Sequence, residues 1–180
     1  MLCGLIAGII DSRVTSVTST LKTQAAVLGG TLAVFWAVFV VNSLLGGSLL
    51  SLGVVPRTTI GLRGILFAPF LHGTLNHIVA NSIPFVALGW MVMLRDERHF
   101  FPVTLAGMVG SGVTAWLLGA PGSVHIGASG VIFAYFGYLL FAGIFQRRIG
   151  SLILSLVVFL LWGFNGPVYL FDMIAAYCGF

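Results

Sequence analysis

The sequence contains very few charged residues, and this scarcity excludes an ordinary soluble domain. Only 7% of the 180 residues are charged, while 59% are hydrophobic and the mean hydropathy is +1.13. A soluble globular domain carries about 25% charged residues, so this chain has too little polar surface to face water. We therefore expect an all-α bundle of membrane spans, each about 20 residues long.

Cysteine and clustered basic charge are also scarce. Cys3 and Cys178 lie at opposite ends and form neither a metal-type spacing nor a disulfide framework. The eight basic residues, which give a net charge of +4, occur singly or in pairs rather than in a stripe with interleaved aromatics. We therefore predict no nucleic-acid partner and interpret these charges as topology signals.

Acidic residues are absent from two long stretches, residues 25–94 and 101–164. A channel or transporter would be expected to carry intramembrane charge, such as a relay or an ion-coordinating carboxylate cluster. Their absence, together with the lack of an internal repeat, argues against that class of protein.

Long apolar runs predict the order of the spans. We divide the chain into a polar N-terminal tail, residues 1–24, in which the Ser- and Thr-rich stretch is expected to be mobile, and a membrane domain, residues 25–180. Full spans are predicted at 25–52, 74–94, 102–119, 129–145 and 150–164, followed by an incomplete sixth from Val168. Pro56, Pro69 and two arginines mark residues 53–73 as a connecting loop.

The basic residues predict the orientation of these spans. Six lie in segments on one side of the membrane: Arg13, Lys22, Arg95, Arg98, Arg147 and Arg148. Only Arg57 and Arg63 lie on the other side, so a cytoplasmic N-terminus is predicted, in the plasma (inner) membrane. The second and fourth spans then both begin at the outer face, which brings their polar residues to one depth.

Small residues predict which helices pack closely. The third span contains GMVGSG, and the fourth carries Gly130, Ala134 and Gly137 at spacings of three and four. Small residues at such spacings let helix backbones approach each other. We expect these two helices to be central.

His77 and Asn81 are the polar pair of the second span. They lie one helical turn apart and share a face. Two such donors can stabilise an oxyanion during acyl transfer, or alternatively form an interhelical polar contact that holds the bundle together. His72, five positions earlier, is expected to be rotated away from His77, and no metal site is predicted.

Ser129, in the stretch GASG, opens the fourth span. Its hydroxyl is a candidate nucleophile, although serine also caps helices and packs between them. No strand is predicted before it, which excludes the soluble hydrolase elbow. We expect His125 at the rim of the bundle and His99 in solvent, and no histidine follows Ser129.

Two stretches in this order, PFLHGTLNHIVAN and HIGASGVIFAYFGYLLF, resemble the rhomboid family of intramembrane serine proteases. The similarity covers about residues 56–164. It implies cleavage of transmembrane protein substrates within the lipid bilayer, without metal, ATP or other cofactor. The roles it implies are Ser129 as nucleophile, His77 and Asn81 as oxyanion hole, His72 as accessory histidine, Gly127 and Gly130 as motif glycines, and Phe133 as the aromatic beside the catalytic histidine.

One feature departs from the family's pattern. Rhomboids are similar in taking the catalytic histidine from the final core span, and no histidine follows Val168 here. A serine without a base is a weak nucleophile, and general-base help contributes about 10²–10⁴-fold in rate. The general base is therefore unknown, and we expect weak activity or none.

Two interpretations follow from that departure. One is a rhomboid-type protease in an incomplete or frame-shifted chain. The alternative is a non-catalytic rhomboid-like protein that binds transmembrane segments. Such a protein has no need of Ser129, His77 and Asn81, so their retention counts against it. The oligomeric state cannot be derived from these residues.

Overall fold

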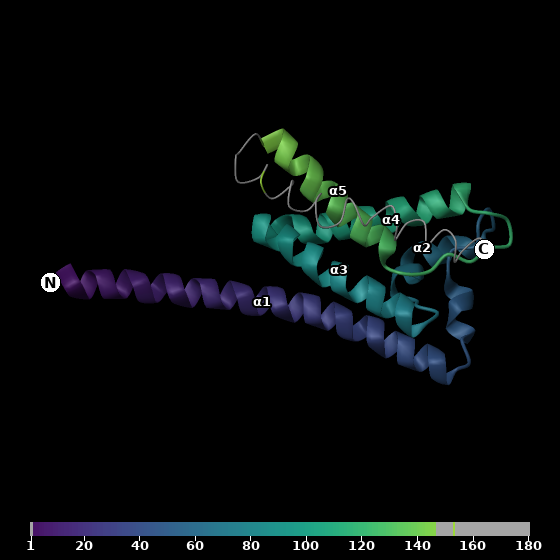
Figure 1. Cartoon of the computed structure of the whole chain (residues 1–180), viewed down its shortest axis with the longest axis horizontal. Coiled ribbons are helices and arrows are strands. Elements are labelled where there is room, and N and C mark those ends of the chain that lie inside the picture. Colours follow the sequence, from purple (N-terminus) through teal and green to yellow (C-terminus); the bar gives the residue numbers. More distant parts are fainter. Residues whose placement is uncertain (1, 147–152, 154–180) are drawn as a thin grey trace.

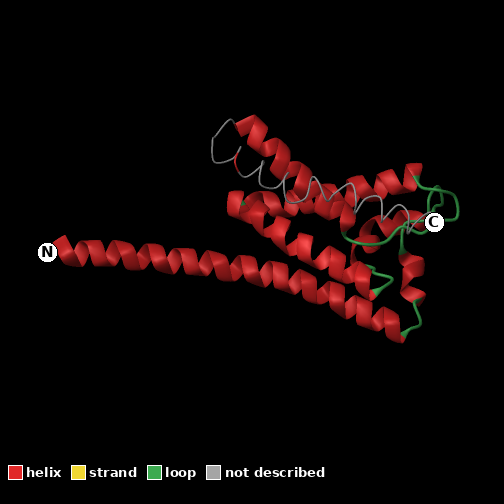
Figure 2. Cartoon of the chain, in the orientation of Figure 1, coloured by secondary structure: helices red, strands yellow, loops and turns green. Residues whose placement is uncertain are grey.

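The computed structural model describes residues 2–146 and residue 153, and the described part is helical (Figures 1 and 2). The long helices are α1 (Leu2–Leu44), α3 (Leu75–Arg95), α4 (Phe100–Leu118) and α5 (Ser129–Gln146). Shorter elements connect them: η1 (Ser48–Leu52), η2 (Ile60–Arg63), α2 (Gly64–Phe67), η3 (Ala68–Phe70) and η4 (Glu97–His99).

The second, third and fourth predicted spans correspond to α3, α4 and α5. Three helical stretches in the described part are long and apolar enough to cross a membrane: Thr18–Leu44, Leu75–Arg95 and Glu97–Leu118. A helical membrane bundle is therefore confirmed. The predicted fifth and sixth spans lie outside the described residues, apart from Ile153.

The N-terminal stretch differs from the expected mobile tail, because α1 is helical from Leu2 onward. Serine and threonine remain compatible with a helix when their hydroxyls bond to the preceding turn. Thr23 does so by donating from Oγ1 to the Ser19 carbonyl at 3.1 Å. The division of the chain at residue 24 remains a prediction.

The first span ends earlier than predicted, at Leu44 rather than at residue 52. Gly46 and Gly47 adopt φ values of 62° and 85°, a left-handed conformation that ends a helix and favours glycine. Asn42 holds the turn: its carbonyl accepts from Gly47 N at 2.8 Å and its Oδ1 accepts from Leu49 N at 3.1 Å. Asn42 is buried, and its backbone and side-chain oxygens both accept hydrogen bonds in this turn.

The connecting loop contains no long helix, as predicted, and is fixed to the end of α4. Arg57 donates from Nη2 to the Gly119 carbonyl at 2.7 Å. Trp116 donates from Nε1 to the Thr58 carbonyl at 2.8 Å. A β-bridge between Val54 and His125, with two backbone hydrogen bonds of 2.9 Å, joins the loop to the segment before α5.

The core forms where α5 packs between α3 and α4. Buried apolar residues from α1, α3, α4 and α5 meet there, including Phe35, Phe85, Phe100, Tyr135 and Leu139. α4 and α5 pack most extensively against each other, which confirms their expected close packing, whereas a central position for α4 stays a prediction. Their approach depends on glycine: a Cβ at Gly107 would lie 2.7 Å from Ala134 Cβ, and one at Gly130 would overlap Ser111.

The α4–α5 contact gives the first testable prediction. Gly107→Val should lower the free energy of unfolding by about 1–3 kcal/mol, because the new side chain overpacks a close helix contact. Gly110→Val is the matched control, since a Cβ at Gly110 in the same helix meets nothing within 4 Å. Unfolding in mixed micelles measures both variants. Equal losses would contradict the close approach of α4 and α5.

Candidate functional site

The start of α3 positions His77 and Asn81. Thr74 is the N-cap, and its side chain accepts a hydrogen bond from the His77 backbone N–H at 3.1 Å. One turn later, Asn81 donates from Nδ2 to the His77 carbonyl at 3.0 Å. Asn81 is buried and His77 is half-buried. The two side chains therefore share one face of the helix, as their spacing predicted.

Gly127 brings the segment before α5 against these two side chains. Its φ is 104°, and a Cβ there would lie 2.5 Å from His77 Nε2 and 3.5 Å from Asn81 Nδ2. Gly127 N donates to the Ala68 carbonyl at 2.8 Å, which ties the segment to the loop before α3. Glycine is required because any side chain would fill the space that His77 occupies.

Ser129 is the first residue of α5 and follows Gly127 by two positions. Ala128 between them is fully buried, whereas Ser129 is half-buried. The structure thus gathers the residues around Ser129 with His77 and Asn81 at one end of the bundle. The starts of α3 and α5 therefore lie close together, in agreement with the prediction that the second and fourth spans begin at the same depth.

The position of His72 differs from the expected one. Its ring was expected to be rotated away from His77, but the two rings lie side by side. The two ring centroids lie 5.0 Å apart in an edge-on arrangement. The expectation placed both residues on one helix, but α3 begins at Leu75, so His72 folds back from the preceding turn. His72 is fully buried, and burial, with a smaller contribution from nearby His77, lowers its pKa to about 4. The ring is therefore neutral at neutral pH.

Both ring nitrogens of His72 are buried and lack a hydrogen-bond partner of full geometry among the described residues, although the Phe70 backbone is close enough to raise the pKa of the ring. A buried polar group without a hydrogen bond lowers stability by about 1–3 kcal/mol, so native folds keep few such groups. Phe35 contacts the ring from α1, with centroids 5.6 Å apart. His72 therefore brings unused hydrogen-bonding capacity into the wall beside His77.

The other two histidines have partners of their own. His125 is half-buried, and its Nε2 lies 2.9 Å from Ser123 Oγ, which itself donates to the Ala120 carbonyl at 2.7 Å. Burial lowers the pKa of His125. His99 lies beyond the far end of α3, with Nδ1 2.8 Å from the Tyr138 hydroxyl, so it is not merely solvated as expected.

The remaining motif residues have distinct positions. Gly130 contacts α4 at Ser111 and so serves helix packing. Phe133 is 40% exposed on α5, and its predicted place beside a catalytic histidine remains a prediction. Within the described residues no three His, Cys, Asp or Glu side chains group as metal ligands. Sequence reasoning missed the Thr74 cap, although a threonine just before the helix was a usable signal.

A protein family and several bacterial proteins are similar to this chain. A family model described as Rhomboid domain matches residues 60–179. Uncharacterized proteins of Mycobacterium tuberculosis (strain H37Rv) and Mycobacterium bovis are each 36% identical over 159 residues, covering 83% of this chain and 66% of theirs. An uncharacterized protein of Mycobacterium leprae (strain TN) is 37% identical over 133 residues, covering 71% of this chain and 53% of its own.

The matches therefore span about two thirds of the length of the first two relatives and about half of the third. No solved structure matches the chain.

The contact of Gly127 with His77 gives the second prediction. Gly127→Ala should lower the free energy of unfolding by more than Gly122→Ala does. The φ angle is 104° at Gly127 and 81° at Gly122, so an alanine at either position carries the cost of a left-handed backbone, about 1–2 kcal/mol. Only the alanine at 127 meets His77, since a Cβ at Gly122 meets nothing within 4 Å. Equal losses of unfolding free energy in mixed micelles would contradict the close contact between residue 127 and His77.

Proposed function

Because the chain belongs to the rhomboid family and is an integral membrane protein, we propose that it is an intramembrane serine protease, with Ser129 as its nucleophile. The observation that carries this proposal is the contact of Gly127 with His77 and Asn81, two residues before Ser129. The proposed substrates are transmembrane proteins, and the reaction is hydrolysis of a peptide bond.

The proposed roles follow from the chemistry of acyl transfer. Ser129 Oγ attacks the carbonyl carbon of the substrate, and the carbonyl oxygen becomes an oxyanion. The His77 ring and the Asn81 amide are the proposed donors to that oxyanion. His72, whose buried ring nitrogens make no well-formed hydrogen bond to any residue the structure describes, is the proposed accessory donor beside them.

The proton of Ser129 needs an acceptor, and no histidine follows Ser129 in these 180 residues. His125 is engaged with Ser123, and His99 lies beyond the other end of α3. His77 meets the segment at Gly127, but to donate to the oxyanion and also accept the serine proton it would have to use its two ring nitrogens, which point in different directions. We therefore propose that these 180 residues are weakly active or inactive as a protease.

The proposed topology has a cytoplasmic N-terminus in the plasma membrane. At one end of the bundle α3 ends at Arg95 and η4 carries Arg98, and at the other end α3 begins just before His77 and α5 begins at Ser129 (Figure 1). The excess of basic residues at the first end supports a cytoplasmic position for it. The site would then open near the outer face, and the predicted fifth and sixth spans would complete the bundle.

The lack of a histidine base favours one alternative. A non-catalytic rhomboid-like protein would bind transmembrane segments and hold them without cleavage. The described arrangement of His77, Asn81 and Gly127 weighs against it, because binding alone needs no oxyanion donors.

Labelling with a fluorophosphonate probe tests the nucleophile. We expect labelling of the membrane-embedded chain that disappears in Ser129→Ala and weakens in His77→Ala. Ser123→Ala is the control, because Ser123 is the serine hydrogen-bonded to a histidine outside the proposed site. Labelling that depended on Ser123, or no labelling of an inserted and folded chain, would contradict a reactive Ser129.

Cleavage of a reporter with one transmembrane segment tests the oxyanion donors. Asn81→Ala should lower the cleavage rate about 10²–10³-fold, as expected when one oxyanion donor is removed. Ser82→Ala should change the rate little, because Ser82 bonds to Trp36 and to its own helix. Crosslinking of the reporter without cleavage, unaffected by Ser129→Ala, would favour the non-catalytic alternative.

A further inference from the structure

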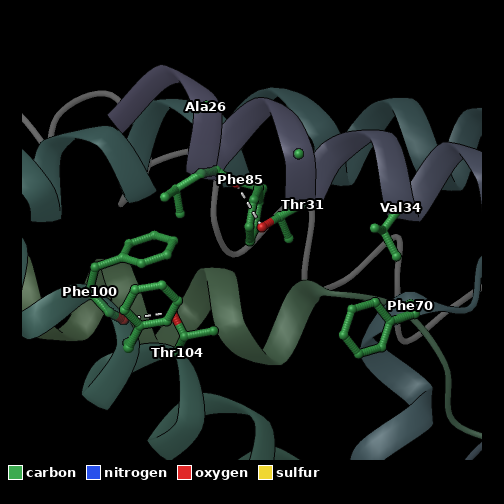
Figure 3. A pocket seen from close by; sticks show the side chains of 10 residues that line it. Ala26, Thr31, Val34, Phe70, Phe85, Phe100 and Thr104 are labelled. Carbon is green, nitrogen blue, oxygen red and sulfur yellow. Dashed lines mark hydrogen bonds between the residues drawn. The ribbon is translucent and has the colours of Figure 1, made fainter. Parts of the chain in front are cut away.

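A cavity separates α1 from the start of α4. Its volume is about 490 Å³, which is within the range of small-molecule sites. α1 packs against α3 with far less contact to α4, so the cavity opens between α1 and α4 with α3 as its floor. Figure 3 shows α1 along one side, facing the rings of Phe85, Phe100 and Phe70.

The walls of this cavity suit hydrocarbon. Its two hydroxyl groups are already satisfied: Thr31 donates to the Val27 carbonyl at 2.9 Å, and Thr104 donates to the Phe100 carbonyl at 2.6 Å. The other lining groups are apolar, and the rim residues Val34 and Phe101 are 46% and 65% exposed. A cavity with no spare polar partner does not hold ordered water well.

One end of the cavity becomes polar. A second cavity of about 270 Å³ shares Val27, Phe100 and Phe101 with the first and is also lined by Thr23, Gln24, Glu97 and Arg98. The side chain of Arg98 is 86% exposed. Asp96 accepts from its Nε and Nη2 at 3.1 Å, two of the five N–H donors of a guanidinium group. The combined cleft therefore runs from a charged mouth to an apolar interior.

The length of the cleft matches one leaflet of a bilayer. Along α1 it extends from Thr23 to Val34, roughly 16 Å at 1.5 Å per residue. The hydrocarbon core of a bilayer is about 30 Å thick, so each leaflet is about half that depth. The charged mouth lies where α3 ends and α4 begins, which is the position of a membrane interface.

We propose that this cleft binds one membrane phospholipid, with an acyl chain in the apolar cavity and the phosphate at Arg98. Basic groups between helices at a membrane interface bind lipid phosphates. Lys22, an exposed residue in the middle of α1 and next to Thr23, is a second basic residue on this stretch of the helix. The charged mouth lies at the end of the bundle opposite His77, whereas the apolar cavity reaches Phe70, two residues before His72. Nothing in the inference requires the proposed protease activity.

Native mass spectrometry of the full chain in detergent, titrated with phosphatidylglycerol, tests the acyl-chain site. Gly30→Leu should weaken phospholipid retention by about tenfold or more, because the new side chain overpacks an occupied cavity. Gly29→Leu is the matched control one residue away: Gly29 does not line the cavity, and a Cβ at either glycine meets nothing within 4 Å. Ala26→Leu fills the same cavity from another position and replaces Gly30→Leu if that variant does not fold.

The phosphate position is tested separately with two arginine variants. Arg98→Gln should weaken retention about fivefold, the effect of one basic group at a lipid surface. Arg63→Gln should not, because Arg63 lies in the loop at the other end of the bundle and donates to the Ser51 carbonyl.

Three results would overturn the proposal. The first is equal retention by the Gly29 and Gly30 variants, and the second is equal binding of diacylglycerol, which has no phosphate. The third is the absence of any retained phospholipid on the unmodified chain.

Discussion

The close approach of α5 to α3 and α4 is the contact on which the rest of the structure depends. In a membrane, helices gain little from burying apolar surface, since lipid is as apolar as leucine, so van der Waals packing at small residues must hold them. Gly107 and Gly130 let α4 and α5 meet backbone to backbone, and Gly127 lets the preceding segment meet His77. One helix therefore forms the centre of the core and also carries Ser129 at its first position.

The sequence predicted α3, α4 and α5 to within about two residues, because polar residues or turn formers bound each apolar run. It failed at both ends of α1 for two different reasons. Hydropathy does not show that threonine hydroxyls can bond within a helix, as Thr23 does. It also does not show backbone conformation, and the positive φ of Gly46 and Gly47 ends α1 before the apolar run ends.

The candidate site shows the same division between local and tertiary information. The shared face of His77 and Asn81 is a property of one helix, so their spacing was enough to predict it. The position of His72 depends on where α3 begins, and a helical wheel extended past Thr74 placed it wrongly. The pairing of His125 with Ser123 depends on a bridge to Val54, which joins segments far apart in the chain.

The two ends of the bundle differ in unused hydrogen-bonding capacity. Beside His77, the two buried ring nitrogens of His72 lack well-formed hydrogen bonds within the described part of the chain, so a polar group that entered there could supply one. In the apolar cavity between α1 and α4, both threonine hydroxyls already donate within their own helices, so they have no free O–H for a polar guest. The fold therefore places unused hydrogen-bonding capacity beside His77 and an apolar lining between α1 and α4.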